Sequence, residues 1–318
     1  MDNEYIHIAF CVDDIYARYI AVSIKSIAEN FRMYKGGGIC IHVVTDNISK
    51  KSVDRLDEII NAYERLSLRI HRVNDSVLKG LKTNNWTVYA WYRLLLPDIL
   101  PIDIKRVLYL DADTLVMSDL SELFTIDMTD KSIAGVIEDN TFNKEYYDRL
   151  GYESDKQYIC SGVLLMNLEY WREHHLAEKM INWAMINEDK LKLPDQDTIN
   201  YICQDSKIIL PLRFNIIQFF FTNEQFYKQP YLTQLKDCIE NPAIIHYAFC
   251  GPWYKDVPRH IMYDYWIKYN RMLLHPVKLK YKSKGRLRFK HIVWDMLHAI
   301  NDRQNISLKD VKCRLANL

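Results

Sequence analysis

Two aspartates, Asp111 and Asp113, stand one residue apart at the end of an apolar run that covers residues 106–110. Alternate side chains of a strand point to the same side, so the two carboxylates can converge on one point. Converging carboxylates repel each other unless a cation lies between them. Oxygen ligands suit Mg²⁺ or Mn²⁺, which commonly also bind the oxygens of a phosphorylated substrate. The pair therefore indicates a metal-dependent enzyme that acts on a phosphate or a diphosphate.

The elements that must position this pair are predicted from hydrophobic periodicity. We expect strands and helices in alternation: strands at 6–13, 39–45, 66–73 and 106–111, and helices at 17–31, 49–63 and 87–96. Pro97 and Pro101 are expected to end the last of these helices. The alternation predicts an α/β fold with a Rossmann-like, mostly parallel sheet and helices on both faces. Ligands bind beyond the carboxyl ends of such strands, where Asp13 and Asp111 are both expected.

The second half of the chain alternates less regularly. We expect strands at 133–138, 159–168 and 208–211 and a helix at 174–188. Residues 265–294 contain nine Lys or Arg and no Asp or Glu, with Tyr, Leu and Phe between them. This change of character divides the chain into a domain of residues 1–262 and a basic C-terminal extension of residues 263–318, with a helix expected near 288–299.

The composition limits the class of protein. A chain of 318 residues with 42 basic and 41 acidic side chains carries almost no net charge, so its overall charge does not indicate nucleic-acid binding. Its seven cysteines are scattered and form no Cys-x-x-Cys pair, which favours a reducing cytosol over a disulfide or zinc framework. No apolar run approaches 18 residues and no signal peptide is expected, so the predicted localisation is cytoplasmic.

Further motifs accompany the aspartate pair in a fixed order. They are Asp13-Asp14-Ile15-Tyr16, Tyr92-Arg93, Ser161-Gly162, Trp171-Arg172, Asp195-Gln196-Asp197, Arg213-Phe214-Asn215, His246-Tyr247 and Pro252-Trp253. In order and spacing, the chain resembles the retaining glycosyltransferases of family eight over about residues 5–255. These are GT-A-fold enzymes that include bacterial lipopolysaccharide galactosyl- and glucosyltransferases and the glycogenins.

The resemblance implies a donor site for a UDP-sugar. Asp111, Asp113 and His246 would hold Mn²⁺, with Mg²⁺ as the alternative, against the two phosphates of the donor. The expected donor-contacting residues are Asp13 at the uracil edge, Tyr16 stacked on the ring, Asp111, Ala112, Asp113, His246, Gly251 and Lys255. A borderline ion such as Mn²⁺ accepts this mixed set of carboxylate and imidazole ligands. It would act as a Lewis acid on the departing diphosphate.

The resemblance also implies the catalytic residues. They are Arg93, which would contact the sugar or balance the acidic pocket, Asp195 at the sugar hydroxyls, Gln196 on the sugar face opposite the leaving group, and Asp197 beside it. A retaining glycosidase uses a carboxylate nucleophile. Because Gln196 is a poor nucleophile, we expect same-face substitution, in which the leaving phosphate oxygen takes the proton of the acceptor.

The chain departs from the family pattern at three positions. The family often has asparagine where this chain has Ile15 and Cys160. Its closing block usually contains a lysine before Pro-Trp, which would contact the diphosphate, and here Gly251 takes that place. Lys255 is close enough in sequence to replace this lysine. The departures put donor affinity or rate in doubt and leave the metal site in place.

Each candidate residue also has a purely structural interpretation. Asp195 and Asp197 could begin a helix, Arg93 could form a structural ion pair, and Tyr16 or His246 could simply pack. Trp171 and Trp253 are expected to pack rather than to bind an acceptor. Two other functions remain as alternatives: a catalytically impaired sugar-nucleotide-binding protein, and a haloacid-dehalogenase-type phosphatase, which shares the apolar strand followed by Asp-x-Asp.

The sequence thus predicts a hexosyltransferase that uses UDP-glucose or UDP-galactose. The expected acceptor is a saccharide, most simply a lipid-linked surface glycan such as lipopolysaccharide core. The basic segment 265–294 is either a solvated face or an attachment to an anionic membrane surface on the inner face of the plasma membrane. No nucleic-acid partner is expected, because no nucleic-acid-binding motif accompanies the basic segment.

Overall fold

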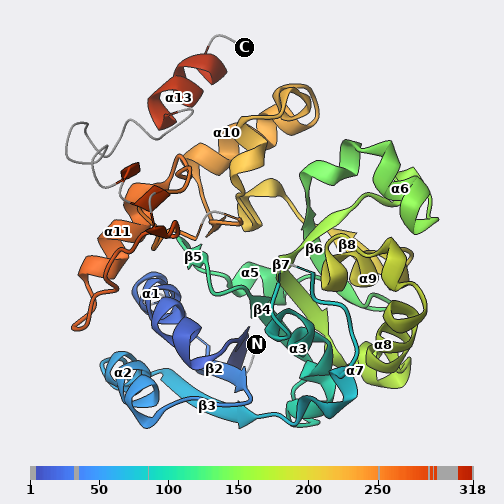
Figure 1. Ribbon diagram of the computed structural model, residues 1–318, viewed down its shortest axis with the longest axis horizontal. Helices are drawn as coiled ribbons and strands as arrows, with labels where there is room; N and C mark the ends of the chain where they lie inside the picture. The colour runs from blue at the N-terminus through green and yellow to red at the C-terminus, as the bar shows by residue number, and fades with distance from the viewer. Residues whose placement is uncertain are drawn as a thin grey trace.

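A seven-stranded sheet forms the centre of the protein (Figure 1). The computed structural model describes residues 5–31, 36–84, 86–249, 251–285, 287–288, 290–291 and 307–316. The strands, in spatial order, are β3 (Leu66–Arg72), β2 (Gly38–Thr45), β1 (Tyr5–Cys11), β4 (Arg106–Leu110), β7 (Ile159–Asn167), β6 (Ile133–Ile137) and β8 (Lys207–Ile209). The predicted α/β class and mostly parallel sheet are confirmed, with one strand reversed: β7 is antiparallel to both β4 and β6.

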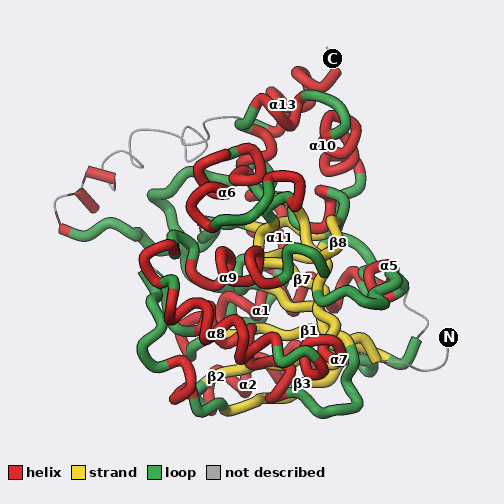
Figure 2. The backbone as a smooth tube through the Cα atoms, turned by 90° about the vertical axis from the view of Figure 1, so that its right-hand side faces the viewer, coloured by secondary structure: helices red, strands yellow, loops and turns green. Residues whose placement is uncertain are grey.

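Helices cover both faces of this sheet, as the alternating pattern predicted (Figures 1 and 2). One face carries α1 (Asp14–Asn30), α2 (Lys50–Ile60), α10 (Tyr231–Glu240) and α11 (Tyr263–Arg271). The other carries α3 (Tyr89–Tyr92), α4 (Leu96–Ile99), α7 (Leu168–Glu173), α8 (Leu176–Ile186) and α9 (Pro194–Ile202). The strands alternate between the two cores: Ile8 packs on the first face and Ala9 on the second.

Helix boundaries follow local capping. The Asp13 carboxylate accepts a hydrogen bond from the Tyr16 amide at 2.6 Å, so α1 begins at Asp14, three residues before the predicted start. The single helix predicted over 87–96 is wrong: the chain forms α3, a 3₁₀ turn over Arg93–Leu95 and then α4. Pro97 lies in the first turn of α4, where its missing N–H is not needed.

The helix predicted over 174–188 is confirmed as α8, and the shorter helix α7, which was not predicted, precedes it. Helix α7 ends at Glu173 and α8 begins at Leu176, because His175 between them has a positive φ of 51°. A right-handed helix cannot continue through that backbone conformation. Periodicity did not predict α7 as a separate helix, although both helices bury their apolar side chains in the same core.

A second, two-stranded sheet extends the Asp-x-Asp turn. Strand β5 (Thr114–Val116) pairs antiparallel with β9 (Ile244–His246), and Thr114 lies opposite His246. Helix α1 fixes β5: the Ser23 hydroxyl donates to the Thr114 carbonyl at 2.6 Å, and the Val116 amide donates to the Ser26 hydroxyl at 2.9 Å. The pairing brings a residue 133 positions away in the sequence next to Asp113.

The two helices described after residue 262 pack onto the core that covers the first face of the sheet. In α11, Trp266 and Tyr269 are buried in the core that α1 shares, and the Asn30 amide donates to the Tyr269 hydroxyl at 2.7 Å. The last helix, α13 (Leu308–Ala316), lies beside α10 and buries Val311 and Leu315 (Figures 1 and 2). Most of the helix predicted over 288–299 lies outside the described residues. Among the described helices, none has the length and hydrophobicity required to span a bilayer.

Arg172 fastens the loop that leads into β4. Its guanidinium donates to five backbone carbonyls at 2.8–3.2 Å, those of Pro97, Leu100, Pro101, Ile102 and Ile104. These carbonyls belong to α4 and to the segment that joins it to β4. A planar guanidinium with five donors can satisfy such a set, whereas a lysine ammonium offers three donors at one point.

We therefore predict that Arg172→Ala lowers the free energy of unfolding by about 3 kcal/mol, because hydrogen bonds from a charged group are lost together. Urea denaturation measures this change. Arg172→Lys should recover less than half of the loss. The control is Arg72→Ala at an exposed strand end, which should change stability by less than about 0.5 kcal/mol. An equal effect of the alanine changes at both arginines would contradict the assignment.

Candidate active site

A small cavity lies where the carboxyl end of β4 meets β7, β9 and the start of α9. It has a volume of about 100 Å³ and is lined by Trp86, Ala90, Arg93, Asp111, Asp113, Cys160, Ser161, Gly162, Leu193, Asp195, Gln196, His246, Ala248 and Phe249. Six residues predicted from sequence therefore share one cavity. Complete ligand pockets have volumes of roughly 300–1,000 Å³. The enclosed space therefore accommodates only part of a nucleotide sugar.

Asp111, Asp113 and His246 form a potential metal-binding cluster. One ligand atom from each lies within 4.8 Å of the others. The Nε2 atom of His246 is 3.3 Å from Asp113 Oδ1 and 3.7 Å from Asp111 Oδ2. Burial alone would lower the pKa of His246, but the Asp113 carboxylate reverses this effect and holds the pKa well above its usual value. The cluster thus attracts positive charge, and a divalent cation could replace the proton of His246.

A hydrogen bond at the second ring nitrogen of His246 sets the orientation of its imidazole. Its Nδ1 atom is 2.9 Å from Asn215 Oδ1, a pairing that leaves Nε2 to face the two carboxylates. Histidine ligands of metals are commonly held in this way through the second ring nitrogen. Asn215 is fully buried, and its amide nitrogen has no hydrogen-bond partner among the described residues. Two carboxylates and one oriented imidazole are donors that fit Mn²⁺ or Mg²⁺.

Gly162 makes room for this cluster. A Cβ atom at this position would lie 2.2 Å from His246 Cε1 and 2.7 Å from Asp111 Oδ2. No side chain fits there without displacing His246. The backbone of Gly162 also holds the turn, because its carbonyl accepts a hydrogen bond from the Asp111 amide at 2.8 Å.

Arg93 links the metal-binding cluster to α9. Its guanidinium lies 3.0 Å from Asp111 and 3.3 Å from Asp195, and it donates to the Ser161 carbonyl at 2.6 Å. Only 4% of Arg93 is exposed. Burial would raise the pKa of Asp111, but Arg93 and His246 outweigh burial and lower it. Burial raises the pKa of Asp195, and Arg93 offsets this only in part.

Gln196 is held by both ends of its amide. Its Oε1 atom accepts a hydrogen bond from the Ser161 amide at 2.9 Å, and its Nε2 atom donates to Glu138 Oε2 at 3.4 Å. The Ser161 hydroxyl donates to Asp195 at 2.9 Å. Ser161 therefore positions both neighbours at the start of α9, and Glu138 supports Gln196 from outside the cavity lining.

Asp197 has a different environment from Asp195 and Gln196. It is fully buried and does not line the cavity. Its carboxylate accepts hydrogen bonds from Arg149 at 2.9 Å, from the Tyr158 hydroxyl at 2.6 Å and from the backbone amides of Lys192 and Leu193. The structure therefore places Asp197 in the support of α9, in contrast to the catalytic position expected from sequence.

Asp13 and Tyr16 lie outside the enclosed cavity, at the start of α1. Asp13 is the N-cap of the helix, and Tyr16 is 37% exposed with its ring edge-on to Trp253 at 5.6 Å. Burial, Tyr254 and Asp113 raise the pKa of Tyr16 to about 12. Ala112, between the two aspartates, is partly exposed.

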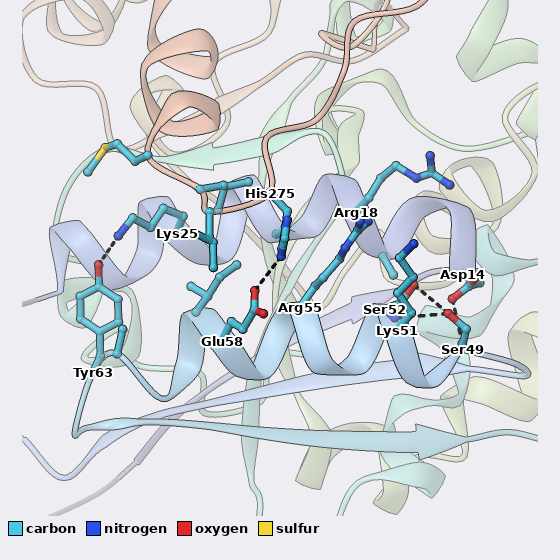
Figure 3. A pocket seen from close by; sticks show the side chains of 17 residues that line it. Asp14, Arg18, Lys25, Ser49, Lys51, Ser52, Arg55, Glu58, Tyr63 and His275 are labelled. Atoms are coloured by element: carbon cyan, nitrogen blue, oxygen red, sulfur yellow. Dashed lines mark hydrogen bonds and ion pairs between the residues drawn. The ribbon is translucent and has the colours of Figure 1, made fainter.

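A larger cavity of about 530 Å³ lies elsewhere, between α1, α2 and residues 272–275 (Figure 3). Several polar groups that line it contact one another: the His275 ring lies 3.5 Å from the Glu58 carboxylate, and the Lys25 ammonium donates to the Tyr63 hydroxyl at 2.6 Å. Its lining contains no pair of converging carboxylates. It therefore lacks the features of the reaction centre.

Comparison with known proteins identifies the family. The sequence model of glycosyl transferase family 8 matches residues 7–256. The chain belongs to this family. It is 29% identical to general stress protein A of Bacillus subtilis, over 83% of this chain and 96% of that protein. It is 27% identical to a lipopolysaccharide 1,2-glucosyltransferase of Escherichia coli, over 92% and 87%.

The fold agrees with that of a solved glycosyltransferase. The galactosyltransferase LgtC, in complex with donor and acceptor sugar analogues, superposes with a TM-score of 0.74 and 24% identity. The match covers 90% of this chain and all of the LgtC chain. The GT-A fold expected from the sequence motifs is thereby confirmed, whereas the haloacid-dehalogenase alternative is wrong for this family 8 protein.

The structure gives a steric reason why Gly251 stands where the family pattern usually has a lysine. A Cβ atom on Gly251 would lie 2.7 Å from the Trp253 ring, which stacks on Tyr19 with ring centroids 3.7 Å apart. Restoring a lysine at this position would displace that stack. Lys255 does not line the cavity: its Nζ lies 5.2 Å from the centroid of the Tyr281 ring. Neither Gly251 nor Lys255 lines the cavity described above.

Sequence reasoning gave no role to several residues that build the site. The Tyr109 hydroxyl donates to Asp111 at 2.6 Å, Asn215 orients His246, and Glu138 contacts Gln196. Tyr109 could have been found, because it lies two positions before Asp111 and so on the same side of the strand. Asn215 stands in a family motif. Glu138 had no sequence signal beyond its place at the end of a strand.

Glu138 supplies a pH-dependent test of this arrangement. Burial raises its pKa to about 7, against the hydrogen bond from Asn140, which lowers it. Between the unfolded pKa of 4.5 and about 7, the folded state binds more protons than the unfolded state. The free energy of unfolding contributed by this group therefore falls as pH rises through that window.

We predict that Glu138→Gln stabilises the protein by on the order of 3 kcal/mol at about pH 8, with the gain vanishing near pH 4. Denaturant unfolding of both proteins across this range measures the difference. The matched control is Glu64→Gln, an exposed carboxylate, which should show a flat difference. A Glu138 variant with the same stability difference at every pH would disprove the assigned titration.

Proposed function

We propose that this family 8 protein transfers glucose or galactose from a UDP-sugar to a saccharide acceptor, with retention of the anomeric configuration. The observation that carries the proposal is the cluster of Asp111, Asp113 and His246 next to the Arg93–Asp195 pair in one cavity. The cluster fits a cation that binds phosphate, and the pair beside it offers polar groups to a sugar.

Asp111, Asp113 and His246 would hold Mn²⁺, or Mg²⁺ as the alternative. When bound, the ion would offset the charge that develops on the departing diphosphate. The protein's own contribution is preorganisation. Asn215 orients His246 and Tyr109 orients Asp111. Asp13 and Tyr16, at the start of α1 and outside the cavity lining, would contact the uracil base.

The remaining groups of the cavity act on the sugar. The buried guanidinium of Arg93 forms ion pairs with both Asp111 and Asp195 and so favours the charged form of each carboxylate. Asp195 would accept hydrogen bonds from sugar hydroxyls. Gln196 presents a neutral amide whose oxygen already accepts the Ser161 amide hydrogen. A neutral, restrained amide is a poor nucleophile, which favours attack by the acceptor on the face that the diphosphate leaves.

In this scheme the acceptor hydroxyl forms the new glycosidic bond as the bond between the sugar and the diphosphate oxygen breaks. The departing phosphate oxygen takes the proton of the acceptor, so no protein base is required. Arg93 and the cation-binding cluster hold the reacting groups in place, and the small, partly apolar cavity with Trp86 and Phe249 restricts water. Donor hydrolysis should therefore be slow relative to transfer.

The proposed acceptor is a lipid-linked surface glycan such as lipopolysaccharide core. The 27% identity to a lipopolysaccharide glucosyltransferase over most of both chains supports this class. We place the reaction on the cytoplasmic side of the membrane. All six cysteines in the described part of the chain are free thiols, and five of them are buried, which suits a reducing compartment.

The basic extension supports attachment to an anionic surface. The described basic side chains between 268 and 290 are exposed, namely Lys268, Arg271, Lys278, Lys280, Lys282, Lys284, Arg288 and Lys290. Leu274 and Leu287 are exposed among them, at 77% and 55%. Each Lys or Arg near an anionic membrane contributes roughly 1 kcal/mol of binding. Exposed leucines add apolar contact with the interface.

We predict that replacing Lys278, Lys284 and Lys290 together by Gln weakens binding to phosphatidylglycerol-containing vesicles about a hundredfold. Sedimentation with vesicles at low and high salt measures this, and binding should fall as salt rises. The control replaces three exposed lysines on other elements, Lys79, Lys144 and Lys179. Equal losses in both triple variants, or no vesicle binding by the wild type, would contradict a dedicated membrane surface.

The central test is calorimetric titration of UDP with and without Mn²⁺. We expect Mn²⁺-dependent binding that Asp113→Ala weakens by more than about a hundredfold, because the variant loses one of three ligands. The matched control is Asp54→Ala, an exposed carboxylate on α2, which should bind UDP as the wild type does. UDP binding that ignores both the metal and Asp113 would overturn the proposed donor site.

Turnover separates an active enzyme from a protein that only binds sugar nucleotides. The missing family lysine at Gly251 is the observation that favours the binding-only alternative. Incubation of UDP-glucose and UDP-galactose with the wild type, followed by NMR, reports both donor choice and the anomer first released by hydrolysis. Metal-dependent UDP binding without release of sugar from either donor, with or without saccharide acceptors, would favour that alternative.

A further inference from the structure

Three histidines and a cysteine gather on the sheet face that carries the second core, away from the active site. His7 lies on β1, Cys40 and His42 on β2, and His71 on β3. Cys40 and His42 are two positions apart on one strand and so share a face. His7 stands directly opposite Cys40 in the parallel register of β1 and β2. The topology of the first three strands thus brings these side chains together.

The potential ligand atoms are close enough to share one ion. One ligand atom each from His7, Cys40 and His42 lies within 4.8 Å of the other two. His7 Nδ1 and His42 Nε2 are 3.0 Å apart. Two nitrogen ligands of a tetrahedral zinc ion, each about 2.0 Å from the metal, are separated by about 3.3 Å. A shift of a few tenths of an ångström would therefore convert this hydrogen-bonded pair into a pair of metal ligands.

His71 completes the arrangement from the next strand. Its Nε2 atom is 2.9 Å from Nδ1 of His42. If His42 donates its Nδ1 hydrogen to His71, its Nε2 lone pair points towards His7. This is the outer-shell pairing by which a protein orients a histidine ligand. The one hydrogen between His7 and His42 then occupies the position that a metal ion would take.

We propose that His7, Cys40 and His42 form a second metal site, selective for a borderline transition metal such as Zn²⁺. Imidazole and thiolate ligands favour Zn²⁺, whereas the carboxylate-rich active-site cluster favours Mn²⁺ or Mg²⁺. Metal binding forms a bond to the Cys40 sulfur and releases its proton to solvent, and no electron is transferred. His42 and Cys40 are almost completely buried, and His7 is partly exposed, which gives the ion a route in from solvent.

Charge and position define what the site can do. Arg69 stands opposite His42 in the strand register, but its side chain is exposed to solvent. The Cys40 thiolate would offset one of the two positive charges of the ion. His7 is the third residue of β1, whereas Asp13 follows its far end. A bound ion would tie β1 to β2 at the end of the sheet opposite the donor site. Its expected effect is on stability.

Co²⁺ is the probe for this site, because a thiolate bound to Co²⁺ gives a charge-transfer absorption band that carboxylate and imidazole ligands do not. We expect this band when Co²⁺ is added to the wild-type protein, and we expect Zn²⁺ to displace it. Cys40→Ser should abolish the band. His7→Gln, at the more exposed ligand, should weaken Co²⁺ binding at least about tenfold.

Cys160 provides the matched control. It is the other cysteine near a metal-binding cluster, with its sulfur 3.8 Å from His246 Nδ1. Cys160→Ser should keep the band if Cys40 is the ligand. Absence of the band in the wild type, or its loss in Cys160→Ser with retention in Cys40→Ser, would overturn the proposal. In that case the three histidines form only a hydrogen-bonded chain across the strands.

Discussion

The active site depends on one buried guanidinium, that of Arg93, which lies between two carboxylates. Arg93 lies 3.0 Å from Asp111 and 3.3 Å from Asp195, and it holds the Ser161 carbonyl as well. Removal of one partner of a buried ion pair leaves an uncompensated charge and is strongly destabilising. This arrangement stabilises the acidic pocket in the absence of the proposed metal ion. It also joins the carboxyl end of β4 to the first turn of α9.

Sequence reasoning anticipated the first half of the fold better than the second. The strands β1, β2 and β4 are largely apolar and β3 alternates apolar and polar residues, both of which periodicity detects, and Ser49 was correctly expected to cap α2. The division of the helix around Arg93 was not predicted, since the apolar pattern continues through the 3₁₀ turn. The reversal of β7 was not predicted either, because a fully buried strand has the same hydrophobic pattern in both directions.

The same limit applies to the candidate site. Asp111, Asp113 and His246 were identified through motifs, and the pairing of β5 with β9 brings them together. Asp197 looked equivalent to Asp195, since both are acidic and begin a helix. Only the fold shows that Asp195 faces the cavity, whereas the Asp197 carboxylate accepts hydrogen bonds from Arg149 and Tyr158. Short motifs give residue types, and the rotation of 100° per residue along a helix decides which of those side chains faces the cavity.

The basic segment is joined to the loop beside the donor site by backbone hydrogen bonds. The Lys280 amide donates to the Trp253 carbonyl, and the Lys255 amide donates to the Lys280 carbonyl. Trp253 in turn stacks on Tyr19, one turn along α1 from Tyr16. A force applied to the basic segment would therefore be transmitted to Trp253 and Tyr19 through backbone hydrogen bonds and ring stacking rather than through a flexible linker. In the proposed function, attachment of the basic segment to a membrane and binding of the donor would be mechanically coupled.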